Sequence, residues 1–416
     1  MKRKIKKFNG EKPEKHYVPL ANIKVVGVGG GGGNVISRMS QDSIRGIDFI
    51  AINTDHQDLD HCQAKKKIYI GKNLTRGLGT GMSPELGRQA AEENRSEIAE
   101  ALAGSDLIFI ASCFGGGTGT GAAPIVAEVA KQTGALTVAF VTKPFAFEGN
   151  QREKIAHEGL SKIKDKVDVV IVVPNDRIFT VIDKDTPLVK AFVVIDDVLK
   201  NALTGIVELI ISPGIINVDF ADMRNVIQDA GSAIVGMGIA SGPDRAVAAV
   251  NQALNSPLLE VSAEGAKGVI LGISGGRDMK MTEINDAAKV VAQVADPSAR
   301  IIFGAYYDRK LKPNQVKVTL IATGFSNGTQ PGHSLFESNY AQQQKKADFF
   351  ENFKATGVYG DTDEGVKKQN EPKGELGRKS PLKSDASETK EGSAENKKDR
   401  ETDIWDIPTF LRKKKK

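Results

Sequence analysis

Two glycine-rich runs constrain the fold of this chain more than any other feature of its sequence. The first, GVGGGGGN, spans residues 27–34, and the second, GGGTGTG, spans residues 115–121. Each follows a short, continuous apolar segment, which is typical of a strand in a parallel sheet that is covered on both faces. Glycine is entropically costly, and it is used where the backbone needs unusual angles or must let another group come close. The sequence therefore predicts two strand–loop–helix units whose loops approach a ligand.

The order of the expected elements predicts an α/β fold. Strands are expected in the first part of the chain at 23–29, 48–54, 106–112, 136–142 and 168–176, and a helix at 84–104. Because strands alternate with helices, they predict a doubly wound parallel sheet. A long helix at 188–211, stopped by SPG, comes next. The last expected strands, which predict a smaller α+β domain, are at 268–274, 300–307 and 316–325.

These patterns divide the chain into six segments. They are a basic N-terminal tail at 1–20, an α/β domain at 21–186, a central helix at 187–215, a C-terminal α+β domain at 216–326, a linker at 327–401 and a terminal peptide at 402–416. The linker is predicted to be disordered, because residues 361–400 contain no aromatic side chain and too few aliphatic ones to offset chain entropy. Apolar residues return in the terminal DIWDIPTFLRKKKK, which indicates a docking peptide, or alternatively an incidental apolar tail.

Composition and charge exclude several classes of protein. The formal net charge is +5, and basic residues are concentrated at the two ends. These ends are interpreted as solvated tails; the alternative is that they contact acidic lipid or nucleic acid. The N-terminus lacks the apolar segment of a signal peptide, and no apolar run approaches the length that spans a bilayer. Cys62 and Cys113 lie far apart in sequence and form no C-x-x-C pair. We therefore expect a cytoplasmic protein with reduced thiols and no protein-bound metal cluster.

The two glycine runs together favour a polyphosphate ligand. Gly27, Gly29 and Gly32 satisfy the G-x-G-x-x-G pattern of a dinucleotide site, although a tight strand-to-helix turn explains that run equally well. The second run changes the interpretation, because two such loops at the carboxyl edge of one sheet can surround phosphates with backbone N–H groups. Thr118 and Thr120 add hydroxyl donors. The chain contains no G-x-x-x-x-G-K-[ST] motif, so the site is not a P-loop.

Several motifs in the chain resemble those of the tubulin/FtsZ GTPase family. In chain order they are GVGGGGGN, AINTD, GLGTGMSPELGR, GGGTGTGAAP, TKPFAFEGNQR, PNDR and NVDFADMR. The similarity, which is greatest to the bacterial cell-division members, runs from about residue 22 to 325 and resumes at DIPTFLRK. This resemblance implies a GTP-dependent polymerising cytoskeletal protein of the mid-cell division ring. It also implies GTP and GDP as ligands, with Mg²⁺ held mainly through the nucleotide phosphates.

The resemblance assigns nucleotide-binding roles residue by residue. The phosphates would lie against Gly30, Gly31, Gly32, Gly33, Asn34, Gly117, Thr118 and Gly119. Glu148 would accept hydrogen bonds from the ribose and Arg152 would lie beside the sugar and phosphates; a surface ion pair is the alternative. Phe192 would stack on the base, and the Asp196 carboxylate would accept the N1–H and N2–H of guanine, which adenine lacks. The alternative for Asp196 is an ordinary acid on a helix surface.

Three polar residues after the long helix are the candidates for catalysis: Asn217, Asp219 and Asp222. The alternative is that one of the two aspartates caps the helix that follows. If Asp196 touches the base, about 24 Å of helix separates it from Ser212 at about 1.5 Å per residue. These carboxylates therefore cannot reach the nucleotide of their own subunit. A head-to-tail contact, which generates a filament, would bring them to the γ-phosphate of a neighbour, and the resemblance implies the same arrangement.

The terminal peptide and the rival functions complete the expectations. The resemblance implies that membrane-tethering and regulatory division proteins bind the peptide, through Asp406, Ile407, Pro408, Phe410 and Leu411. The RKKKK end could add weak attraction to anionic lipid, and no nucleic-acid partner is expected. Two rivals remain open: an NAD- or FAD-dependent oxidoreductase built on residues 27–32, and a scaffold that binds nucleotide without hydrolysing it.

Overall fold

The computed structural model describes residues 21–325, apart from 42–45, 181, 184, 213, 257–262 and 309. The expectations for the basic tail at 1–20, the linker at 327–401 and the terminal peptide concern residues outside this part of the chain. The proposed docking residues therefore also lie outside it: Asp406, Ile407, Pro408, Phe410 and Leu411.

Eleven strands form one sheet in the order β3-β2-β1-β4-β5-β6-β8-β11-β9-β10-β7. Six strands belong to the first part of the chain: β1 (Ile23–Val28), β2 (Ile47–Asn53), β3 (Lys66–Tyr69), β4 (Leu107–Cys113), β5 (Leu136–Lys143) and β6 (Val169–Pro174). All neighbours among these six pair in parallel. The doubly wound parallel sheet expected from the sequence is therefore confirmed.

The second part of the chain contributes five strands: β7 (Gly214–Ile216), β8 (Gly231–Ser241), β9 (Gly268–Gly275), β10 (Arg300–Tyr307) and β11 (Gln315–Thr323). The pairing here is mixed, because β11 is antiparallel to both β8 and β9 whereas β9 and β10 are parallel. Residues 169–171 of β6 pair with residues 231–233 of β8, which joins the two halves in one sheet. This continuity was not expected from the sequence.

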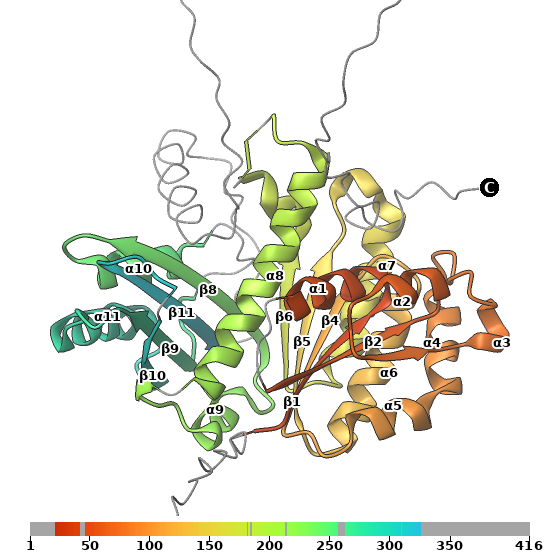
Figure 1. Ribbon diagram of the computed structural model, residues 1–416, viewed down its shortest axis with the longest axis horizontal. Helices are drawn as coiled ribbons and strands as arrows, with labels where there is room; N and C mark the ends of the chain where they lie inside the picture. The colour runs from red at the N-terminus through yellow and green to blue at the C-terminus, as the bar shows by residue number, and fades with distance from the viewer. Residues whose placement is uncertain are drawn as a thin grey trace, which may run out of the picture.

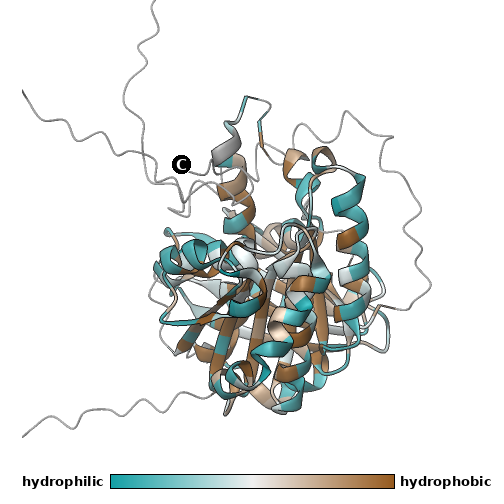
Figure 2. Ribbon diagram, turned by 90° about the vertical axis from the view of Figure 1, so that its right-hand side faces the viewer, coloured by the Kyte–Doolittle hydropathy of each residue, from teal (hydrophilic) through white to brown (hydrophobic). Residues whose placement is uncertain are grey.

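Helices cover both faces of the sheet. In chain order they are α1 (Gly29–Gln41), α2 (His56–His61), α3 (Lys72–Thr75), α4 (Pro84–Glu93), α5 (Arg95–Leu102), α6 (Thr118–Gln132), α7 (Asn150–Lys164), α8 (Leu188–Ile211), α9 (Phe220–Ile227), α10 (Arg245–Leu254) and α11 (Met281–Val294), with short 3₁₀ turns η1 (Ala146–Glu148) and η2 (Asn175–Thr180). One core cluster contains buried residues of α1, α8 and α9, and another contains those of α4 to α7. Figure 2 shows the result as largely hydrophobic strands beneath helices of mixed hydropathy.

The helix expected at 84–104 is two helices, α4 and α5, separated at Asn94. The side chain of Asn94 accepts a hydrogen bond from the Gly71 amide at 3.0 Å and donates one to Glu97 at 3.0 Å. Asparagine competes for backbone groups in this way, and it therefore favours helix ends over helix interiors. The single-helix expectation was wrong because composition alone did not reveal this contact.

Helix α8 has the limits expected from the sequence and lies over the junction of the two halves (Figure 1). Its buried side chains, such as Leu203 and Ile206, share a core cluster with Ile171 of β6 and Ile321 of β11. Within the described ranges, no helix combines the length and the apolar character needed to cross a membrane.

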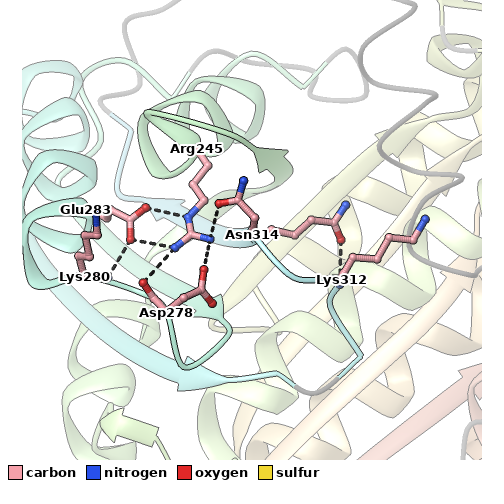
Figure 3. Close-up of polar contacts among 7 residues, drawn as sticks. Arg245, Asp278, Lys280, Glu283, Lys312 and Asn314 are labelled. Atoms are coloured by element: carbon pink, nitrogen blue, oxygen red, sulfur yellow. Dashed lines mark hydrogen bonds and ion pairs between the residues drawn. The ribbon is translucent and has the colours of Figure 1, made fainter.

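A buried arginine organises the end of the second half (Figure 3). Arg245, at the start of α10, is 3% exposed and donates hydrogen bonds to Asp278, to Asn314 and, at 2.7 Å, to Glu283. Glu283 in turn accepts the Lys280 amide at the start of α11. The network therefore ties α10 to α11 and to the turn between β10 and β11.

Candidate functional site

The two glycine runs lie side by side at the carboxyl edge of the sheet. β1 and β4 are neighbours, with Val28 opposite Ser112, and the strand order reverses between them. In α/β sheets, ligands bind outside the carboxyl ends of the strands at such a switch point. A Cβ atom placed on Gly29, whose φ is +75°, would come within 2.9 Å of the Gly119 nitrogen. The two loops therefore touch, as the sequence led us to expect.

The first turn of α1 is pressed against the end of β4. A Cβ atom on Gly31 would lie only 2.3 Å from the Cys113 sulfur, so no larger side chain fits there. Burial first, and then the nearby charges of Asp196 and Glu148, raise the pKa of Cys113 to about 12 despite a hydrogen bond with Thr142. The thiol is therefore neutral.

Hydroxyl groups brace the start of α6. The Thr118 hydroxyl is hydrogen-bonded to that of Thr54 at 2.6 Å and to that of Thr80 at 3.2 Å. Thr54 and Thr80 belong to the AINTD and GLGTG segments, and their role at the site was not assigned from the sequence. Thr120 is 2% exposed and accepts the Gly115 amide at 3.0 Å, so its hydroxyl supports the loop from inside.

Glu148 and Arg152 form the ion pair that was the alternative to a binding role, but it is not a surface pair. Arg152 Nη1 lies 3.2 Å from Glu148 Oε2, and the side chains are 19% and 7% exposed. The second carboxylate oxygen of Glu148 accepts the Phe145 amide at 3.0 Å. The pair is thus fixed in place at the start of α7, at the same edge of the sheet as the glycine loops.

Asp196 is paired with a residue that sequence reasoning missed. Its carboxylate lies 3.2 Å from Arg38 Nε of α1, and the two side chains are 18% and 20% exposed. Arg38 and Asp196 are far apart in sequence, so only the packing of α1 against α8 reveals the contact. Asp196 is therefore held by an ion pair and is not an ordinary acid on a helix surface.

Phe192 is 8% exposed and packs edge-on against Phe145, with ring centroids 5.6 Å apart. Val194 and Ile195 are buried in the same cluster, which accounts for the apolar character of α8 between Phe192 and Asp196. The ring lies one helical turn from Asp196. Its observed contacts are with other apolar side chains, and stacking of Phe192 on a base stays a prediction.

A cavity of about 190 Å³ lies between α1, α2 and the end of β2. Gly30, Gly33, Asn34 and Arg38 of α1 line it, together with Asn53 of β2. Three of these residues are expected to bind nucleotide, so the space borders the glycine loop. In the described ranges, no group of three or more His, Cys, Asp or Glu side chains could hold a metal ion.

The three candidate catalytic residues lie at the opposite end of α8. Asn217, Asp219 and Asp222 are all exposed, whereas Val218 between the first two is buried. Asp219 caps α9 by accepting the Ala221 amide at 3.3 Å, and the Asn217 side chain accepts the Gly214 amide at 2.6 Å. The capping alternative is therefore confirmed for Asp219, while Asp222 lies in the first turn of α9.

The structure does not bring these three residues to the glycine loops. α8 has 24 residues, so its ends are about 36 Å apart at about 1.5 Å per residue. Asp196 is the ninth residue of α8, about 22 Å from the last residue of the helix at about 1.5 Å per residue, and the loop at 217–219 follows that end.

Comparisons with known proteins agree with this architecture. The model described as the GTPase domain of the Tubulin/FtsZ family matches residues 22–183, and the model of the FtsZ family C-terminal domain matches residues 231–326. The chain is similar to an empty FtsZ dimer from M. jannaschii at 44% identity, with a TM-score of 0.71, covering 77% of this chain and 95% of that one. A point mutant of FtsZ from M. jannaschii matches at 47% identity with a TM-score of 0.69, covering 73% of this chain and 91% of that one.

A more distant structure shares the fold. The CetZ2 protofilament from Haloferax volcanii with bound GTPγS is 20% identical, with a TM-score of 0.64, covering 80% of this chain and 99% of that one. The dinucleotide oxidoreductase suggested by residues 27–32 alone is wrong, because the domain that holds both glycine loops matches a GTPase model. The chain therefore belongs to the Tubulin/FtsZ family and is a guanine-nucleotide-binding GTPase.

Proposed function

We propose that this GTPase polymerises head to tail and forms the ring that divides the cell. One observation carries the proposal: the groups suited to holding nucleotide lie toward the first half of α8, and the exposed carboxylates of Asp219 and Asp222 follow its other end. A subunit with this layout cannot bring its own carboxylates to its own nucleotide. A heterologous contact that repeats without closing supplies the missing half from the next subunit and builds a filament.

In this proposal the nucleotide occupies the carboxyl edge of β1 and β4. Backbone amides of the two glycine loops, residues 30–34 and 117–119, hold the phosphates, because the N-termini of α1 and α6 favour negative charge. Glu148 and Arg152 bind the sugar, and Asp196 accepts the guanine N–H groups. Bound guanine thus replaces part of the contact that Arg38 makes with Asp196.

Catalysis takes place where one subunit meets the next. Asp219 and Asp222 polarise the attacking water, and Asn217 helps to position it; the exposure of all three suits a surface that a neighbour covers. Among the residues that the structure describes, no group of three or more His, Cys, Asp or Glu side chains could hold a metal ion, so Mg²⁺ would be held through the phosphates, where it offsets developing charge.

Filament turnover follows from this arrangement. GTP binding prepares a subunit for assembly, assembly completes the GTPase site, and hydrolysis weakens the contact between subunits. The peptide at 402–416 tethers filaments to membrane-attached and regulatory division proteins at mid-cell, with weak lipid attraction from RKKKK. Similar structures include an FtsZ dimer and, at 20% identity, a CetZ2 protofilament, which supports self-association of this chain.

Phosphate release over a range of protein concentrations tests the shared site. Turnover per subunit should rise with concentration, because assembly creates the active site, whereas a site within one subunit gives a constant value. Asp222→Ala should bind GTP normally and lose turnover by about 10²–10⁴-fold. Asp286→Ala, which removes an exposed acid on α11, is the matched control and should behave as wild type.

A mixing experiment separates action in trans from a simple loss of function. Asp196→Ala keeps the loop at 217–222 but should bind GTP poorly, and Asp222→Ala keeps the nucleotide site. Each alone should be nearly inactive, while their mixture should recover turnover, because the loop of one variant serves the GTP of the other. A mixture that stays inactive, or an Asp222→Ala protein as active as wild type, would contradict the proposal.

A further inference from the structure

Tyr306 on β10 links the end of α8 to the loop that carries the proposed catalytic residues. The side chain is buried, with 4% of its surface exposed. Its hydroxyl donates a hydrogen bond to the Leu209 carbonyl at 2.8 Å and accepts one from the Val218 amide at 3.4 Å. One oxygen atom thus joins β10 both to the end of α8 and to the loop that follows α8, and Figure 1 shows β10 and α9 beside that end of α8.

The bond to Leu209 gives a hydrogen-bond donor to a carbonyl in the last turn of α8. The last four carbonyls of an α-helix have no partner within the helix. The Glu208 carbonyl accepts the Ser212 amide, but the Leu209 carbonyl is one residue further on and receives the tyrosine hydroxyl instead. The position of the hydroxyl is therefore set by α8.

The bond to Val218 acts on the backbone between two proposed catalytic residues. Val218 is buried, while Asn217 and Asp219 on either side of it are exposed. Because successive side chains of an extended segment point to opposite sides, fixing the Val218 amide also sets the direction of its neighbours. At 3.4 Å the bond is long for an N–H···O contact and therefore weak, so it contributes little to the stability of the fold.

The surrounding backbone leaves room for this ring and its hydroxyl. Tyr306 pairs with Gly214 of β7, and the register shifts between Ala305 and Tyr306. A Cβ atom on Gly304 would lie 2.5 Å from the tyrosine oxygen, and one on Gly214 would lie 2.9 Å from the ring. Burial raises the pKa of Tyr306, outweighing the opposite effect of the Val218 amide, so the hydroxyl keeps the proton that it donates to Leu209.

We infer that Tyr306 is a positioning residue for GTP hydrolysis: its hydroxyl holds the 217–219 loop in register with α8, so that Asn217 and Asp219 face the neighbouring subunit. This inference rests on the proposed function, because it requires that the loop act on a neighbour's nucleotide. Tyr306 itself touches no nucleotide, so its removal should affect the rate of hydrolysis and leave nucleotide binding unchanged.

Tyr306→Phe tests the inference, because it removes the hydroxyl and keeps the ring. The variant loses both hydrogen bonds of the hydroxyl, and a cost of about 1.4 kcal/mol to the position of the loop corresponds to about a 10-fold change. We expect kcat in assembled filaments to fall by about that factor, with the Kd for GTP and the pelleted fraction in a non-hydrolysable GTP analogue unchanged. Tyr307→Phe makes the same chemical change at the next residue, where the side chain is 55% exposed, and should leave all three values at wild type.

A second control separates positioning from stability. Ile321→Val removes one buried methyl group from the same core cluster, costs about 1 kcal/mol of stability, and should not lower kcat. If Tyr306→Phe keeps wild-type kcat while Asp222→Ala is inactive, the inference is wrong and the proposed function stands. If Ile321→Val lowers kcat as much as Tyr306→Phe, the effect is one of stability and the inference is also wrong. If Asp222→Ala turns over at the wild-type rate, the proposed function fails and the inference fails with it.

Discussion

Arg38 of α1 and Asp196 of α8 form an ion pair with 3.2 Å between guanidinium nitrogen and carboxylate oxygen. The contact joins the helix that begins in the first glycine run to the helix that carries the proposed base-binding acid. Each side chain is about one-fifth exposed, so the pair is partly shielded from water. It orients the carboxylate before any nucleotide arrives.

Asp196→Asn should weaken GTP binding and leave the weak binding of ATP unchanged. A carboxylate accepts both guanine N–H groups, whereas the amide has one acceptor oxygen, so about 1.4 kcal/mol, or about a 10-fold rise in the Kd for GTP, is expected. Competition of GTP and ATP against a fluorescent guanine nucleotide measures the change. The exposed Asp286→Asn is the control. An equal loss for both nucleotides would show that Asp196 does not read the base.

Thr118→Val should reduce both GTP affinity and thermal stability. The substitution keeps the shape of the side chain but leaves the Thr54 and Thr80 hydroxyls without their shared partner, which costs about 1–3 kcal/mol. Calorimetry with and without GTP measures both effects. Thr133→Val removes a hydroxyl at the other end of α6 and should leave GTP affinity unchanged. If the two variants bind GTP equally well, Thr118 has no part in the site.

Lys317→Met should destabilise the junction between α8 and the second half. Lys317 Nζ lies 2.9 Å from Glu208 of α8 and 3.1 Å from Asp308, and its side chain is 14% exposed. Burial acts to lower the pKa of Lys317, but the two carboxylates outweigh it and the pKa is raised. Removing the cation leaves two partly buried carboxylates unpaired, and a loss of about 3 kcal/mol in the free energy of unfolding is expected.

Urea unfolding measures that loss, and Lys289→Met is its control. Lys289 pairs with Asp286 on the surface, with both side chains more than half exposed, so little change is expected. Equal midpoints for the two variants would mean that the Lys317 cluster contributes nothing beyond a surface pair.

The hydrogen bonds of Arg245 predict how the stability of the fold depends on pH (Figure 3). Hydrogen bonds from Arg245 lower the pKa of Glu283 against the opposing effect of burial, and they also lower the pKa of Asp278. A carboxylate with a depressed pKa in the folded state stabilises the fold above its unfolded pKa, here about 4.5 for Glu283, and that contribution is lost as the pH falls through the folded value.

The melting temperature of the wild type should therefore fall as the pH drops from 5 to 3. In Arg245→Met the protein should be less stable at pH 7, and the further drop in acid should be shallower, because the carboxylates no longer have depressed pKa values. Melting curves across this range measure both. Parallel curves for the two proteins would mean that other groups control acid stability.

The sequence was informative wherever one local pattern determines the structure. The runs before the two glycine loops are mostly apolar, so burial on both faces of a parallel sheet followed directly, and α8 ended where SPG interrupts it. No strand was expected at the position of β8, because Gly236 and Gly238 interrupt its apolar pattern. Those glycines are required by α10, since a Cβ atom on either would lie 2.0 Å from a carbonyl oxygen of that helix.

The contacts that complete the site could not be predicted from the sequence. Arg38 meets Asp196, and Tyr306 meets Val218, only because elements far apart in the chain pack together. The break at Asn94 has the same cause, since the partner that stabilises it is the amide of Gly71. A single sequence contains the side chains for such contacts, but it does not state which pairs will be neighbours.

The short pairing between β6 and β8 has a mechanical consequence for a filament. Only three residue pairs join these strands, from Val169 opposite Gly231 to Ile171 opposite Ala233, whereas β8 and β11 pair over nine. A pulling force applied across the two halves would therefore meet little resistance from the sheet at this seam. Most of the tension would pass through the side chains of α8 that pack against both halves, and α8 would therefore carry the load within each subunit.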